Sequence, residues 1–302
     1  MSYKNKTITI ETTNRCSASC TMCPRDKFSD RLSTMSVEMY TKIIEDANDV
    51  GITTIDLCGF GDVFLDNTII EKLIMTKKIN PEFNIYASTT GIAMREKYHS
   101  YINKYIDTLR FSIHGFTQET FEDVMRGLSY DKCMRNIHEF LKINENTYTI
   151  GSFVQLPENQ KEVQDWISYW EPKLSKVCVW LPHNWTTGRK FRSIDKSKQK
   201  TCGRPVSGPL NVSANGDAHV CCFDYNKELK IGNMHVNSIS DVLNSTKMRE
   251  IQRRHEDNNF TGMLCEYCDQ TIHDKDVLVY ATNKCREVGK ETSTLFNFND
   301  NR

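Results

Sequence analysis

The sequence predicts an α/β fold, a partial (β/α)6 TIM-like barrel followed by a small domain made of a β-hairpin and a helix. From residue 7 to about residue 181, short β-rich segments alternate with amphipathic helical segments. Beyond that point the alternation stops, and Gly, Pro and paired Cys residues become frequent. We place the boundary near residue 190. This gives domains at 1–190 and 191–286 and a polar tail at 287–302.

Six candidate strands account for the first part of the chain. They are Thr7–Glu11, Thr54–Leu57, Asn84–Ser88, Thr108–Ile113, Thr147–Phe153 and Val177–Leu181. Helical patterns follow them, beginning after Ser36, at Asp66 or Asn67, at Met94, after Ser129 and at Val163. Ser36 and Ser129 are expected helix caps, and Gly51 is an expected helix end. Strands interleaved with helices predict a parallel sheet, which places its chemistry at the carboxyl ends of the strands.

A different pattern occupies the second part. Alternating residues around Leu210–Ser213 and His219–Cys221 predict a β-hairpin, with Gly216 between the two runs. The segment Ile239–His255 is expected to form one helix.

Composition excludes several classes of function. The chain has 302 residues with 39 Lys+Arg and 39 Asp+Glu, so its formal net charge is zero. That balance argues against broad electrostatic binding to nucleic acid or to an anionic membrane. Mean hydropathy is −0.55, and no apolar run suits a membrane span or a signal peptide. We therefore expect a cytoplasmic protein, without nucleic-acid or membrane partners.

The twelve cysteines are the unusual feature. In a reducing compartment, clustered cysteines indicate metal binding or redox chemistry rather than disulfides. Cys16, Cys20 and Cys23 follow the first strand with gaps of three and two residues. Three thiolates are one fewer than a closed zinc site needs. The alternatives are a four-iron cluster with one open iron, or a zinc loop completed by a distant residue.

This Cys-x3-Cys-x2-Cys spacing resembles the radical S-adenosylmethionine (radical SAM) superfamily. Later segments agree with that family in order over residues 7–190. They are Gly59-Phe-Gly61-Asp62 after the second strand, Ser88–Gly91 after the third, Ser112 with Arg126 after the fourth, and Gln155-Leu156 after the fifth. The resemblance implies a 4Fe–4S cluster on Cys16, Cys20 and Cys23, with S-adenosylmethionine at its open iron.

The resemblance also implies the residues that contact S-adenosylmethionine. They are Gly59, Gly61, Asp62, Ser88, Thr90, Ser112, Arg126, Gln155 and Leu156. Three positions depart from the usual pattern: Met22 replaces an aromatic residue, Asp62 a Glu, and Thr90 an Asn. Asp62 keeps a carboxylate for the methionine ammonium group, and Thr90 keeps a hydroxyl for the sugar.

A second cysteine group lies in the small domain. Cys202, Cys221, Cys265 and Cys268 have a spacing that suits zinc and an iron–sulfur cluster equally. The order Cys-x(9–15)-Gly-x4-Cys followed by a distant Cys-x2-Cys resembles the C-terminal SPASM/twitch extension of radical SAM enzymes. Only Cys285 follows Cys268, so the resemblance implies the shorter twitch form with one auxiliary 4Fe–4S cluster. That form is similar to the 2-deoxy-scyllo-inosamine dehydrogenases. Spacing does not separate Cys221 from its neighbour Cys222.

The remaining cysteines and two histidines are secondary candidates. Cys58, Cys133 and Cys178 lie in or beside predicted strands and helices and are expected to pack in the core. Cys222 and Cys285 are candidate hydrogen-atom donors to a substrate radical, with a structural thiol as the alternative. His114 and His183, at strand ends, are candidate substrate contacts, with a structural role as the alternative. The stripe containing Trp166 and Trp170 is expected to be core.

The family implies reductive cleavage of S-adenosylmethionine to methionine and a 5′-deoxyadenosyl radical, which abstracts a hydrogen atom from a substrate C–H bond. Flavodoxin or ferredoxin is the expected electron donor. Our main hypothesis is an oxidoreductase or epimerase acting on a small polar metabolite of the sugar or aminocyclitol type. It rests on the single auxiliary cluster and on a first strand that begins about six residues into the chain, which leaves no space for a leader-peptide domain. The alternatives are radical modification of a peptide or protein, and a non-catalytic zinc or electron-transfer protein.

Overall fold

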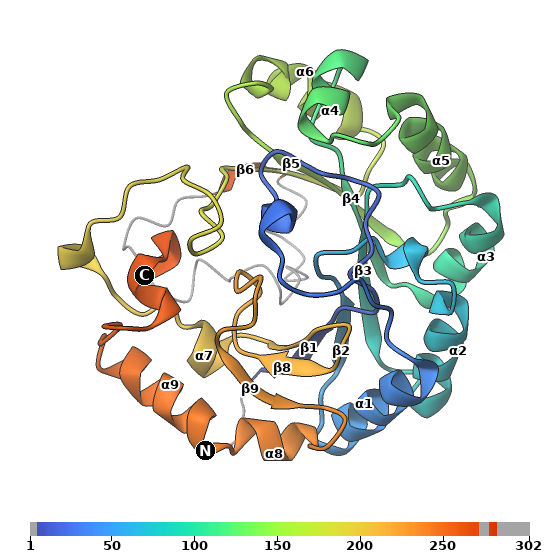
Figure 1. Ribbon diagram of the computed structural model, residues 1–302. Coiled ribbons are helices and arrows are strands. Elements are labelled where there is room, and N and C mark those ends of the chain that lie inside the picture. Colours follow the sequence, from blue (N-terminus) through green and yellow to red (C-terminus); the bar gives the residue numbers. More distant parts are fainter. Residues whose placement is uncertain (1–4, 272–277, 283–302) are drawn as a thin grey trace.

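The computed structural model describes residues 5–271 and 278–282. Within these residues the strands form one curved sheet of ten strands, in the order β10-β6-β5-β4-β3-β2-β1-β7-β8-β9. Helices α1 to α6 line the outside of the curve, and the long loop after β1 lies on the inside (Figure 1). This is the α/β partial barrel that the sequence predicts.

The six predicted parallel strands are confirmed, with ends that shift by one residue at most. They are β1 (Thr7–Ile10), β2 (Thr54–Leu57), β3 (Asn84–Thr89), β4 (Thr108–Ser112), β5 (Tyr148–Val154) and β6 (Lys176–Trp180). Each pairs with the next in parallel register. Their carboxyl ends therefore meet at one edge of the sheet, where the predicted site residues lie.

Helices cover the convex face of the sheet. They are α1 (Val37–Asp49), α2 (Ile69–Ile79), α3 (Glu96–Tyr105), α4 (Gln118–Val124), α5 (Tyr130–Ile143) and α6 (Val163–Trp170). The hydroxyls of Ser36 and Ser129 accept the capping hydrogen bonds predicted for them. Trp166 and Trp170 are fully buried, as expected of core residues. The short helix α4 has little apolar periodicity of its own, because only Phe121 and Val124 are buried along its seven residues.

The C-terminal half joins the same sheet. The predicted hairpin is confirmed as β7 (Leu210–Val212) and β8 (Asp217–His219), which are antiparallel, with Gly216 at a φ of 84° in the turn. β7 also pairs in parallel with β1, so this half extends the barrel sheet beyond residue 190. β9 (Lys230–Asn233) continues the sheet past β8, and β10 (Leu278–Ala281) pairs antiparallel with β6 at the opposite end.

The prediction of one helix over Ile239–His255 is wrong. Two helices form instead, α8 (Ile239–Leu243) and α9 (Thr246–Glu256). The hydroxyl of Ser245 accepts a hydrogen bond from the Met248 amide and so starts a new helix. A four-residue helix, α7 (Arg204–Ser207), precedes the hairpin. Among the described residues, no helix has both the length and the apolar character needed to cross a membrane.

Candidate active site

The loop after β1 carries the first cysteine group and is held against the end of α4. The Ser19 amide donates to the Arg126 carbonyl at 2.7 Å, and the Thr21 amide donates to the Val124 carbonyl at 2.9 Å. The loop thus crosses the carboxyl ends of the strands, on the inner side of the sheet (Figure 1).

Cys16, Cys20 and Cys23 lie close together in this loop. Burial raises the pKa of all three thiols, to about 11 for Cys23. The pKa of Cys20 rises further because of the neighbouring Cys23 and Cys16, so the three sulfurs share one electrostatic environment. Thiols must lose their protons to bind iron. The Arg25 guanidinium favours that loss, since it lowers the pKa of each of them.

Arg25 also joins this loop to the Gly-rich loop after β2. Its Nη1 atom donates to the Asn14 carbonyl at 2.7 Å and to the Phe60 carbonyl at 2.8 Å. Gly61 permits the close approach of the two loops. A Cβ atom there would lie 2.0 Å from the Thr13 carbonyl oxygen, which leaves no space for any other residue.

Asp62 is buried and strongly hydrogen-bonded. Its carboxylate accepts from the hydroxyls of Thr89 and Thr90 at 2.7–3.0 Å and from the amides of Thr90 and Phe64 at 2.8 and 3.2 Å. In this structure the carboxylate and the Thr90 hydroxyl are partners of each other. If the Asp62 carboxylate or the Thr90 hydroxyl contacts S-adenosylmethionine, it does so as a member of this hydrogen-bond network.

The other predicted cofactor contacts lie at or near the ends of β3, β4 and β5. Ser88 accepts a hydrogen bond from Nε of Arg110 at 3.1 Å. Ser112 ends β4, and Gln155 and Leu156 follow β5, where the Leu156 amide donates to Asn159 at 2.7 Å. Arg126 is exposed and pairs with Asp123 at 3.6 Å. Strand ends thus bring these residues to the same edge as the cysteine loop, except for the Arg126 side chain.

The second cysteine group is buried in the C-terminal half. The chain brings together Cys202, before α7, Cys221, after β8, and Cys265 and Cys268, in and after the 3-10 helix Leu264–Tyr267. Burial raises the pKa of Cys221, Cys265 and Cys268, and neighbouring cysteines of the group raise it further. The Arg204 guanidinium lowers the pKa of Cys221 and Cys268.

The structure distinguishes Cys221 from Cys222. Cys221 is buried, and its pKa is raised by Cys268 and Cys202. Cys222 is exposed, although desolvation raises its pKa and Asp56 on β2 raises it further. Cys221 is therefore the buried one of the two thiols, near Cys202 and Cys268, while Cys222 is exposed and lies near Asp56.

In this structure no three His, Cys, Asp or Glu side chains of the described residues meet in the arrangement of a single-metal site. Two sets of neighbouring thiols remain, each with an arginine that favours the thiolate form. Thiolate sets of this kind suit the separate irons of an iron–sulfur cluster.

Comparison with known proteins agrees with this geometry. The Radical SAM superfamily pattern matches residues 10–169, more than half of the chain. The chain belongs to the radical SAM superfamily. As a radical SAM enzyme it uses a 4Fe–4S cluster together with S-adenosylmethionine. Residues 202–269 match SPASM, an iron-sulfur cluster-binding domain, so the family also accounts for the second cysteine group. Both matches contradict the zinc alternatives.

Similar proteins carry out different reactions. A GTP 3′,8-cyclase of Desulforamulus reducens is 24% identical over 140 residues, which cover 44% of this radical SAM chain and 42% of the cyclase. The chain thus spans less than half of that relative.

Three solved structures share the fold. BtrN in complex with AdoMet and 2-DOIA has a TM-score of 0.62 and 16% identity over 92% of this chain and 100% of BtrN. Streptococcus suis SuiB bound to the precursor peptide SuiA has a TM-score of 0.69 and 14% identity over 84% and 67% of the two chains. Native anSMEcpe with bound AdoMet has a TM-score of 0.67 and 14% identity over 90% and 92%.

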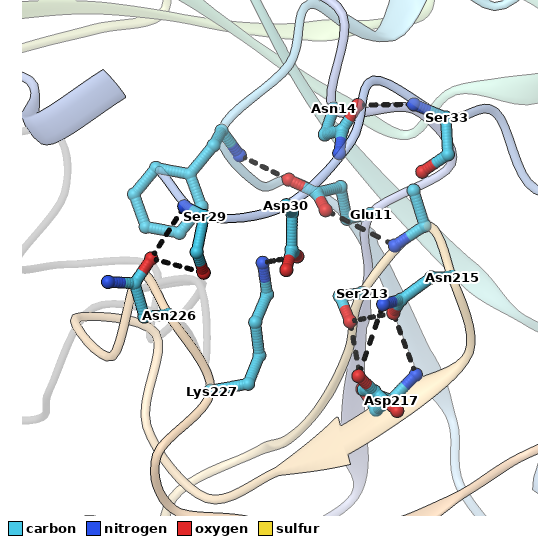
Figure 2. Close-up of polar contacts among 12 residues, drawn as sticks. Glu11, Asn14, Ser29, Asp30, Ser33, Ser213, Asn215, Asp217, Asn226 and Lys227 are labelled. Carbon is cyan, nitrogen blue, oxygen red and sulfur yellow. Dashed lines mark hydrogen bonds and ion pairs between the residues drawn. The ribbon is translucent and has the colours of Figure 1, made fainter. Parts of the chain in front are cut away.

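Contacts that the sequence did not predict hold the radical SAM cluster loop to the C-terminal half (Figure 2). Glu11 accepts hydrogen bonds from the Phe60 amide at 2.7 Å and the Ala214 amide at 3.2 Å. Asp30 forms an ion pair with the buried Lys227. Of the residues in these contacts, only Glu11 carries a signal in the sequence, because it is a charged residue at the end of a predicted strand.

Arg189 makes a similar connection from the segment after β6. It donates to the Thr21 carbonyl at 3.1 Å, to Asp26 Oδ1 at 2.6 Å and to the Cys23 carbonyl. Its charge also lowers the pKa of Cys23. We infer that Arg189 fixes the last turn of the cluster loop.

The secondary candidates have mixed outcomes. Cys133 and Cys178 are buried as expected, but Cys58 is only partly buried, since it lies on the inner face of the sheet next to Arg110. His114 has a structural role: its Nδ1 accepts from the Val154 amide at 3.1 Å, and burial lowers its pKa to about 3.

His183 packs between Trp185 and Phe223, with ring centroids 4.2 and 3.9 Å away. It therefore joins the two halves of the chain through ring contacts. Cys285 lies outside the described residues.

Proposed function

We propose that this radical SAM enzyme is an oxidoreductase or epimerase that acts on a small polar metabolite. When bound, the cluster and S-adenosylmethionine supply a 5′-deoxyadenosyl radical that removes a hydrogen atom from a substrate C–H bond. The proposed ligands of that cluster are Cys16, Cys20 and Cys23. The proposed ligands of a single auxiliary 4Fe–4S cluster are Cys202, Cys221, Cys265 and Cys268.

The position of Cys222 carries the epimerase form of this proposal. Its thiol is exposed yet desolvated, neighbours the auxiliary cysteines, and is influenced by Asp56 on the inner face of the sheet. Desolvation raises its pKa, which favours the protonated thiol, the state needed for giving up a hydrogen atom. In an epimerase, the Cys222 S–H bond breaks and its hydrogen atom forms the new C–H bond. The sulfur radical then takes up one electron and one proton from the reducing system.

Oxidation is the other fate of the same substrate radical. A carbon radical that bears a hydroxyl loses one electron and its hydroxyl proton to become a ketone. In that case Cys202, Cys221, Cys265 and Cys268 would hold an auxiliary cluster that would supply the electron acceptor, and Cys222 takes no part.

The test uses anaerobic, reconstituted and reduced protein. Formation of 5′-deoxyadenosine is measured with candidate sugars for wild type, Cys222→Ala and the buried control Cys133→Ala. Loss of epimer with continued 5′-deoxyadenosine formation in Cys222→Ala supports epimerisation, and solvent deuterium appears in the wild-type product. A ketone produced equally by both proteins supports oxidation. Failure of wild type to cleave S-adenosylmethionine contradicts the proposal.

Peptide modification is the second candidate. The fold likeness to SuiB bound to a precursor peptide motivates it. Specific capture of a peptide by the holoenzyme, with none of the small sugars turned over, would favour this candidate.

A further inference from the structure

The inner face of the sheet carries a group of polar side chains at two neighbouring levels. Thr9 on β1, Asp56 on β2 and Tyr86 on β3 are paired across adjacent strands, and Arg110 on β4 lies opposite Ser88. Residues adjacent to them along the strands, such as Ile8, Ile55 and Leu109, are buried in the core beneath the helices. Because side chains alternate along a strand, the polar group points away from the helices.

Two of these side chains have unused hydrogen-bonding capacity. Asp56 Oδ2 accepts from the Thr9 hydroxyl at 3.1 Å, but the buried Oδ1 atom has no partner among the described residues. The buried hydroxyl of Tyr86 also has no partner there. Asp56 and Tyr86 are each only 1% exposed. Buried polar atoms without partners are uncommon in folded proteins, so two in one place need an explanation.

Arg110 provides positive charge at the same place. Its Nε donates to Ser88 Oγ at 3.1 Å, and its Nη2 reaches the weak acceptor Cys58 Sγ at 3.5 Å. Within the described residues, no carboxylate forms an ion pair with it. Burial raises the pKa of Asp56 to about 7, so this carboxyl group is only partly ionised at neutral pH. A guanidinium is always charged and prefers a carboxylate or phosphate partner.

We propose that Arg110, together with Tyr86 and Asp56, binds an anionic oxygen group of the substrate, a carboxylate or a phosphate. The guanidinium pairs with the anion, and Tyr86 and Asp56 bond to its remaining oxygens or to an adjacent hydroxyl. This inference rests on the proposed function and narrows its substrate class. An acidic sugar matches the charge of Arg110, whereas the ammonium group of an aminocyclitol would face a like charge.

The experiment measures binding, not turnover, so its outcome is separate from that of the proposed function. Anaerobic holoenzyme with S-adenosylmethionine is titrated with glucuronate, glucose 6-phosphate, glucose and glucosamine, and binding is followed by saturation-transfer NMR. We expect at least one anionic sugar to bind roughly tenfold or more tightly than glucose and glucosamine, since charge-assisted bonds to Arg are strong. Which anion binds distinguishes a carboxylate from a phosphate.

Variants locate the binding. Arg110→Gln should remove the preference for the anion, and Tyr86→Phe should weaken anion binding without loss of stability, because its hydroxyl has no partner to lose. Arg135→Gln, on the exposed face of α5, is the matched control for loss of one charge. Iron content and circular dichroism establish that each variant is folded.

Three outcomes of the sugar titrations would overturn the proposal. They are absence of binding by both anions, equal binding of all four sugars, and anion binding that survives both Arg110→Gln and Tyr86→Phe. Weaker binding of S-adenosylmethionine to Arg110→Gln would also overturn it, because the anion would then be the carboxylate of the cofactor itself.

Discussion

Nε2 of His255 lies 3.4 Å from Sγ of Cys265, and both residues are buried. The other ring nitrogen, Nδ1, lies 3.0 Å from the Thr201 hydroxyl, which already accepts a hydrogen bond from the Gly203 amide. The Thr201 proton is therefore available to Nδ1, and Nε2–H is available to the sulfur. Burial lowers the pKa of His255 to about 4, so the ring is neutral near pH 7.

We predict that His255→Phe lowers the reduction potential of the proposed auxiliary cluster. Hydrogen bonds to cluster sulfurs raise the potential. One bond of about 1 kcal/mol corresponds to about 40 mV for a one-electron couple. Redox titration followed by electron paramagnetic resonance measures the shift. His235→Phe, at an exposed position, should leave the potential unchanged, and an equal shift in both variants would contradict the prediction.

Arg189 should control how firmly the first cluster is held. We expect Arg189→Ala to lose iron from that cluster roughly tenfold or more faster, because groups that support metal ligands typically contribute that much. Iron release to a chelator gives the rate. The control is Lys198→Ala, which removes only an exposed pair with Asp195 at 3.6 Å. Equal rates for Arg189→Ala and wild type would show that the loop needs no such support.

Gly61 should tolerate no side chain. In Gly61→Ala the new methyl group would collide with the Thr13 carbonyl, and we expect a loss of about 3 kcal/mol or more in the free energy of unfolding. Gly262→Ala is the comparison, because its φ of 70° is strained but nothing lies within 4 Å of the new atom. A cost of about 1 kcal/mol is expected there. Denaturant titration gives the free energy of unfolding of both variants. A loss in Gly61→Ala no larger than that in Gly262→Ala would contradict the prediction.

Asp56 should make stability depend on pH. Its pKa is raised by burial from 3.8 to about 7, so between these pH values the folded protein holds a proton that the unfolded chain has released. Stability should therefore fall as pH rises through this window, by about 4 kcal/mol at most. Asp56→Asn should remove this decline and be more stable than wild type above pH 7. The exposed Asp165→Asn is the charge control, and parallel curves for Asp56→Asn and wild type would contradict the prediction.

The elements that could be predicted are those with a local cause. Ser36 and Ser129 cap helices through their own hydroxyls, and the six β-rich segments carry their own periodicity. The cysteine groups could be predicted because metal binding depends on short spacings, and the family comparisons agree with them. Local signals of this kind require no knowledge of distant contacts.

What the sequence could not predict depends on long-range contacts. The pairing of β7 with β1 joins residues about 200 positions apart, and no local pattern encodes it. The same holds for the ion pair of Asp30 with Lys227. It also holds for Arg110, which has no distinguishing feature in the sequence and is grouped with Asp56 and Tyr86 only by the pairing of their strands. The split between α8 and α9 was missed for a different reason: the apolar spacing continued across Ser245, while its capping hydroxyl interrupted the helix.

The pairing of β7 with β1 also bears on any attempt to cut the protein in two. A fragment ending near residue 190 would leave the backbone groups of Thr7–Ile10 unpaired along one side, and bare sheet margins of this kind invite aggregation. The C-terminal fragment would also be unstable, since β7 and β8 have three residues each and so short a hairpin is not stable in isolation. The two halves should therefore melt together in a single cooperative transition.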